Sequence, residues 1–110
     1  MRVLITGGSG FIGSYLIQHL LKEQPNDQLF SVGVVPGHFE GVTEIECDLT
    51  DEAKVHSVLE GIQPDTVYHL VGMSRVSASI GFSEYFSRNT LTTTTLLRSL
   101  QTIGKKVTFF

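Results

Sequence analysis

The first glycine-rich stretch of this chain reads Thr6-Gly7-Gly8-Ser9-Gly10-Phe11-Ile12-Gly13. Apolar residues at 3–5 precede it, and an apolar run that recurs at helical spacing follows it, so the pattern predicts a strand, a turn and a helix. Glycines lacking a Cβ let the backbone approach a diphosphate, and the start of a helix offers free N–H groups and the positive end of its dipole. The stretch therefore indicates a dinucleotide-binding turn, although its glycines are not spaced as G-x-G-x-x-G. A tight turn that binds nothing is the alternative.

The composition is that of one small globular domain covering residues 1–110. The net charge of −3 and the scattered Lys and Arg residues argue against a nucleic-acid partner. No apolar run approaches the roughly 18–20 residues needed to span a membrane. Met1-Arg2 leads directly into the first strand, so we expect no signal peptide. The single cysteine, Cys47, cannot form an internal disulfide and is expected to be buried, which suits a reducing cytoplasm.

Strands and helices are expected to alternate along the chain. Apolar patterning predicts strands at 2–6, 28–35, 42–47, 66–71 and from 105 onward, and helices at 11–23, after an N-cap at Thr50, and at 82–103 with Gly104 as its stop. Such an order builds an α/β fold, a Rossmann-type doubly wound parallel sheet with strand order 3-2-1-4-5. A ligand crevice is then expected between the carboxyl ends of the first and fourth strands.

Four blocks, in order and at matching spacing, resemble the extended short-chain dehydrogenases/reductases that act on nucleotide sugars. The blocks are Thr6–Gly13, Cys47-Asp48-Leu49-Thr50-Asp51, Tyr68-His69-Leu70-Val71-Gly72 and Asn89-Thr90-Leu91-Thr92-Thr93. Within that family, Ser74-Arg75-Val76 with Ser79 is most similar to the GDP-mannose 4,6-dehydratase and GDP-4-keto-6-deoxymannose reductase branch. The resemblance implies NAD or NADP as cofactor and a dehydratase, epimerase or reductase reaction.

The resemblance also implies roles for the glycine turn. Gly7 would form the turn, Gly10 would allow the diphosphate to approach, and Gly13 would allow close packing of helix against strand. The backbone N–H groups of Phe11 and Ile12 would bind phosphate, while we expect their side chains to lie in the core.

Further cofactor and substrate contacts are implied at the ends of the third and fourth strands. Asp48 and Leu49 would border the adenine, although Asp48 could instead only shape its turn. Leu70, Val71 and Gly72 would lie beside the ribose on the nicotinamide side. For Ser74 and Ser79 there are two alternatives: hydrogen bonds to substrate or pyrophosphate, or a solvated loop.

The choice between NAD and NADP rests on the end of the second strand. Family members that bind NAD often place Asp or Glu there to hold the ribose hydroxyls, whereas this chain has Val35. The absent acid removes a repulsion against a 2′-phosphate and tilts the choice slightly toward NADP, with His38 as the nearest cation.

We expect His69 to be a structural strand residue and Asn89 to tie the long helix to the sheet or to serve the active site. The histidines share no ligand-like spacing, so no metal is expected.

No catalytic residue is assigned in this sequence. The family's chemistry uses a Ser or Thr after the fifth strand and a Tyr-x-x-x-Lys pair, in which Lys lowers the pKa of the tyrosine. Residues 1–110 contain neither that Ser or Thr nor that pair. We therefore expect the cofactor-binding portion of a longer enzyme, unable to turn over substrate alone. A non-catalytic NAD(P)-binding or regulatory module and a structural domain with an empty groove are the alternatives. An uncovered strand at the sheet edge predicts association into homo-oligomers.

Overall fold

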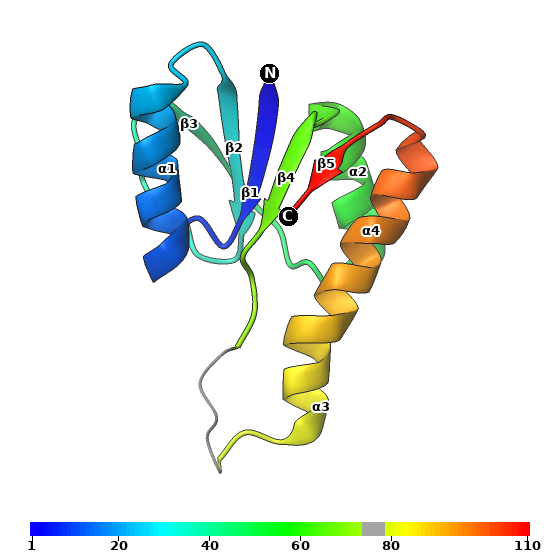
Figure 1. The fold of residues 1–110 in the computed structure, drawn as a ribbon. Coiled ribbons are helices and arrows are strands. Elements are labelled where there is room, and N and C mark those ends of the chain that lie inside the picture. The colour runs from blue at the N-terminus through cyan, green and yellow to red at the C-terminus, as the bar shows by residue number, and fades with distance from the viewer. Residues whose placement is uncertain (74–78) are drawn as a thin grey trace.

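The computed structural model describes residues 1–73 and 79–110. Within these residues, five parallel strands form one sheet with the order β3-β2-β1-β4-β5 (Figure 1). The strands are β1 (Arg2–Thr6), β2 (Gln28–Gly33), β3 (Val42–Glu46), β4 (Thr66–His69) and β5 (Thr108–Phe109). The helices are α1 (Phe11–Glu23), α2 (Glu52–Ile62), α3 (Phe82–Tyr85), the π-helix η1 (Phe86–Leu91) and α4 (Thr92–Ile103). The predicted α/β class and strand order are confirmed.

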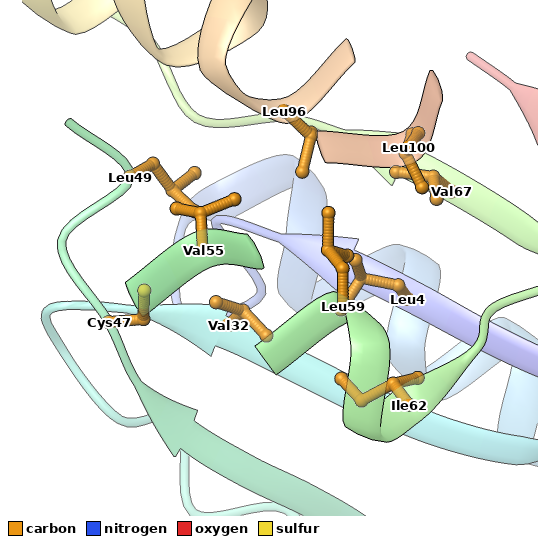
Figure 2. Close-up of a cluster of buried hydrophobic side chains, with 10 residues drawn as sticks. All are labelled: Leu4, Val32, Cys47, Leu49, Val55, Leu59, Ile62, Val67, Leu96 and Leu100. Carbon is orange, nitrogen blue, oxygen red and sulfur yellow. The ribbon is translucent and has the colours of Figure 1, made fainter. Parts of the chain in front are cut away.

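Helices cover the sheet on both faces, with α1 on one side and α2 and α4 on the other (Figure 1). Alternate residues of β1 point to opposite faces, so Val3 and Ile5 pack toward α1 while Leu4 packs toward α2 and α4. The larger buried cluster joins Leu4 to residues of α2 and α4, including Leu59 and Leu96 (Figure 2). Burial on both faces explains why β1 is apolar at successive positions.

Two strands end earlier than their apolar residues predict. β2 stops at Gly33, which pairs with Glu46, the last residue of β3, so Val34 and Val35 have no strand partner and are exposed. β4 stops at His69 rather than at residue 71, because β1, its partner, has already turned away. Strand length is thus set by where the neighbouring strand ends.

The N-cap of α2 was predicted one residue too early. Asp51 is the cap, and its side chain accepts a hydrogen bond from the backbone N–H of Lys54 at 3.2 Å. Thr50 does not cap the helix, because its N–H and hydroxyl both donate to Asp48 Oδ1, at 2.9 and 2.7 Å. Asp48 thereby closes the turn between β3 and α2.

The predicted long helix at 82–103 is present, but its middle is a π-helix. η1 widens the backbone between α3 and α4, and the N–H of Thr92 bonds to the carbonyl of Ser87, five residues earlier. The helix ends as predicted at Gly104, which adopts a left-handed conformation with φ 71°. The following strand begins only at Thr108, three residues later than predicted.

Candidate functional site

The turn between β1 and α1 packs directly against the turn that follows β4. Gly7 has φ 74°, a conformation that glycine adopts without strain. A Cβ at this position would also lie 3.0 Å from the carbonyl carbon of Leu70 and from the nitrogen of Val71. A Cβ on Gly13 would overlap the carbonyl oxygen of Gly7 and lie 2.8 Å from Gly8 Cα. Glycine at 7 and at 13 is therefore required by the fold itself.

Gly10 differs from these two glycines because it is exposed and a single atom would crowd a Cβ there. The nearest atom to a Cβ there is the carbonyl oxygen of Gly7, at 3.3 Å. Gly10 is also the N-cap of α1, and no side chain caps this helix. The first N–H groups of α1, including those of Phe11 and Ile12, thus receive no hydrogen bond from an N-cap side chain, and such groups suit an anion.

The prediction that the side chains of Phe11 and Ile12 lie in the core is wrong. They are 80% and 67% exposed. The buried residues of α1 are Gly13, Ile17 and Leu20, which recur every three or four residues on the face toward the sheet. Phe11 and Ile12 lie on the opposite face of the first turn.

A cavity of about 510 Å³ opens at the carboxyl ends of β2, β3 and β4, beside the helix that begins at Phe82. It brings together four of the residues predicted to bind the cofactor: Asp48, Leu49, Val71 and Gly72. The other predicted cofactor residues lie outside its lining, on the side of β1: Gly7, Gly10, Phe11, Ile12, Gly13 and Leu70. The glycine turn and the cavity are joined by the contact of Gly7 with the Leu70–Val71 backbone.

The two residues predicted beside the adenine also have structural roles. The pKa of the Asp48 carboxyl is held below its usual range, chiefly because Oδ1 accepts the N–H and hydroxyl bonds from Thr50. Its other oxygen, Oδ2, has no partner within residues 1–73 and 79–110, so Asp48 can shape its turn and still accept an outside donor. Leu49 is 4% exposed and packs in the core cluster while lining the cavity.

The predicted substrate residues are less defined. Ser79 lies in a turn before α3 and outside the lining of the cavity. Ser74 falls outside the described residues.

Asn89, expected to tie the long helix to the sheet or to serve the active site, holds the backbone at the cavity rim. Its Oδ1 accepts a hydrogen bond from the N–H of Met73 at 2.6 Å, and its Nδ2 donates to the Met73 carbonyl at 3.0 Å. A Cβ on Gly72 would lie 3.0 Å from Asn89 Oδ1, so glycine at 72 leaves room for this amide. The pair of bonds fixes the chain where it leaves β4.

Sequence reasoning missed one wall of the cavity. Residues of α3 and η1 form it, namely Ser83, Glu84, Ser87 and Arg88, with Gly33, Val34, Cys47, Thr50, Met73 and Thr92 completing the lining. Glu84 and Arg88 form an ion pair of 3.2 Å across one helical turn. The spacing 83, 84, 87, 88 on a predicted helix was the signal that could have identified this wall.

Cys47 is buried as predicted, and burial raises the pKa of its thiol.

Two negative findings hold for the part of the chain that the structure describes. No three His, Cys, Asp or Glu side chains gather in a way that could hold a metal ion. No helix there is both long and apolar enough to cross a membrane.

Comparison with known proteins identifies relatives of this chain. A family model described as GDP-mannose 4,6 dehydratase matches residues 4–110. The chain is 39% identical to a GDP-6-deoxy-D-talose 4-dehydrogenase of Aggregatibacter actinomycetemcomitans, over 91% of this chain and 30% of that protein. It is 33% identical to a dTDP-glucose 4,6-dehydratase of Salmonella typhimurium, over 88% of this chain and 30% of that protein.

A solved structure supports the same relationship. The UDP-glucose 4-epimerase of Thermus thermophilus in complex with NAD superposes with a TM-score of 0.82 at 28% identity, covering 94% of this chain and 35% of that one. The chain therefore spans about a third of the length of the relatives that it matches.

Proposed function

This chain belongs to the GDP-mannose 4,6 dehydratase family, within the extended short-chain dehydrogenases/reductases, and from that premise we propose that it binds a nicotinamide adenine dinucleotide. The observation that carries the proposal is the uncapped start of α1 at Gly10, an exposed glycine that offers no side chain to the first N–H groups of the helix. Free N–H groups and the helix dipole favour a diphosphate at this position.

The remaining contacts follow the sheet edge on both sides of that diphosphate. Asp48 and Leu49, in the cavity, border the adenine, and Asp48 Oδ2 accepts its exocyclic amine. Leu70, Val71 and Gly72 lie beside the other ribose, and the close approach of Leu70 and Val71 to Gly7 supports this order along the groove. Ser74 and Ser79 are proposed to contact the substrate.

The bound dinucleotide supplies hydride transfer, and the relatives' names point to a nucleotide sugar as substrate. The proposed reaction class is dehydration, epimerisation or reduction of a 4-keto group, carried out by a protein of which this chain is the cofactor-binding portion. The site suits a reducing compartment, the cytoplasm, because the buried thiol of Cys47 lines the cavity.

We further propose NADP over NAD. The end of β2 contributes Gly33 and the apolar Val34 to the cavity, so no carboxylate at that position repels a 2′-phosphate.

Calorimetric titration of the chain with NADP and with NAD tests the proposal. The informative variant is Gly10→Asp, because an aspartate is a good N-cap and will keep α1 stable while its charge repels a diphosphate. We expect at least about a tenfold loss of affinity, which corresponds to about 1.4 kcal/mol. Gly81→Asp is the control, since Gly81 is also an exposed glycine N-cap without a side-chain cap, and it lies outside the cavity lining.

Two results would overturn the proposal. One is the absence of binding heat with either dinucleotide. The other is a Gly10→Asp variant that binds as tightly as the unmodified chain.

A further inference from the structure

One half-buried histidine joins three elements around the proposed groove. His69, the last residue of β4, has Nδ1 2.7 Å from Thr6 Oγ1 at the end of β1. Its other ring nitrogen, Nε2, lies 2.9 Å from Thr93 Oγ1 in the first turn of α4. The ring therefore bridges the strand that enters the glycine turn and the helix that follows the cavity wall.

The neighbours of this ring determine where its proton lies. Thr6 Oγ1 accepts hydrogen bonds from the N–H groups of Leu70 and Val71, at 3.1 and 3.3 Å. Thr6 is fully buried, so its hydroxyl needs an acceptor for its one proton. Within residues 1–73 and 79–110 that acceptor is Nδ1 of His69, which is therefore unprotonated.

The second nitrogen follows from the same accounting. The hydroxyl of Thr93 donates to the carbonyl of Asn89 at 2.8 Å, so Thr93 Oγ1 accepts from Nε2–H of His69. The ring is thus neutral and carries its proton on Nε2. Burial favours the neutral form as well, because it lowers the pKa of His69.

The two ends of this hydrogen-bond chain hold the two ends of the turn after β4. At the first end, Thr6 binds the Leu70 and Val71 backbone, which lies against Gly7 with no space for a Cβ. At the second end, Thr93 bonds to the backbone of Asn89, whose side chain makes both hydrogen bonds to Met73. A change at the ring therefore reaches both ends of the turn.

We propose that His69 is a positioning residue, which as its neutral Nε2–H tautomer fixes the Leu70–Met73 turn that lines the dinucleotide groove. The inference rests on the proposed function for the identity of the ligand. His69 itself does not line the cavity. It acts through Thr6 and Thr93 on backbone that does.

The test compares variants that keep one half of the ring's hydrogen bonding. His69→Asn keeps an acceptor near the position of Nδ1, His69→Gln keeps a donor near that of Nε2, and His69→Ala keeps neither. With each hydrogen bond worth about 1 kcal/mol, we expect His69→Ala to weaken NADP binding about tenfold or more, and each half-mimic to recover part of the loss. Thr93→Val removes the contact between the ring and α4, together with the bond from the Thr93 hydroxyl to the Asn89 carbonyl, and serves as a second variant should His69→Ala fail to fold. His56→Gln is the control, since His56 lies on α2, outside the cavity lining, with its Nε2 3.9 Å from Glu60 Oε2.

Two readouts do not depend on ligand binding. Nitrogen-15 NMR of the histidine ring at neutral pH is expected to show a protonated Nε2 and an unprotonated Nδ1. Amide hydrogen exchange at Leu70 and Val71 is expected to accelerate in His69→Ala and in Thr93→Val. A ring protonated on Nδ1, or unchanged exchange in both variants, overturns the inference. Failure of the unmodified chain to bind either dinucleotide overturns the proposed function, while these two readouts still decide whether His69 positions the turn.

Discussion

Replacing Gly13 by alanine is the sharpest test of how the glycine turn is built. The new Cβ would overlap the carbonyl oxygen of Gly7 and approach Gly8 Cα to 2.8 Å. Both neighbours are backbone atoms of the turn, so no side chain can rotate to make room. Either α1 must move away from the turn or the turn itself must change shape.

The expected loss of stability combines two opposing effects. Overpacking a tight contact costs about 1–3 kcal/mol, and a contact between backbone groups belongs at the upper end of that range. Alanine in place of glycine in a helix stabilises the folded state by about 1 kcal/mol through its higher helix propensity. The net loss is therefore about 2 kcal/mol, which lowers Tm by about 8 °C for a domain of this size.

Gly61→Ala provides a matched comparison within the same fold. Gly61 lies in α2, and a Cβ there has no heavy atom within 4 Å, so the substitution gains helix propensity without a clash. We expect this variant to be more stable than the unmodified chain by up to about 1 kcal/mol. Thermal and urea unfolding of both variants measure the difference. Equal stability of the two, or a more stable Gly13→Ala, would refute the packing described for the turn.

Three further outcomes are expected. Asn89→Ala removes both hydrogen bonds to Met73 and should cost about 2 kcal/mol in urea unfolding, whereas Asn89→Asp, which keeps the acceptor, should lose less. The lowered pKa of Asp48 makes its contribution to stability complete above its ordinary value of 3.8 and lost as the pH falls through the folded value, so Asp48→Asn should flatten the fall in unfolding midpoint with acid. Light scattering over a concentration series should show dimers or larger assemblies, because β5 is an edge strand and the adjoining Phe110 is 64% exposed; a constant monomer mass would contradict this.

Local sequence signals were sufficient where a single segment determines its own structure. The bounds of β1 and α1 were predicted correctly because an apolar run, a glycine turn and a helical period follow one another without conflict, up to the break before Pro25. The strand order followed from the alternation of strands and helices. For the same reason the glycine turn could be recognised before its geometry was known.

Features that depend on another segment of the chain could not be predicted from the local sequence. Val34 and Val35 favour a strand by their side chains, yet β2 ends at Gly33 because β3 offers no residue beyond Glu46. The exposure of Phe11 depends on which way the first turn of α1 faces once Ile17 is packed on the sheet. Neither the end of β2 nor the exposure of Phe11 can be predicted from the residues at those positions alone.

The run of four threonines at 92–95 shows how an unfavourable local signal can be the informative one. β-Branched residues lower helix propensity, and helical periodicity alone predicts an ordinary α-helix across 82–103. In the structure, the hydroxyls of Thr92, Thr93 and Thr94 each donate to the carbonyl four residues earlier, within η1. These carbonyls belong to the widened turn, where the backbone bond from Thr92 reaches back five residues instead of four. The threonines therefore support the π-helix that carries Asn89 to the rim of the cavity, and Thr93 links that helix to His69.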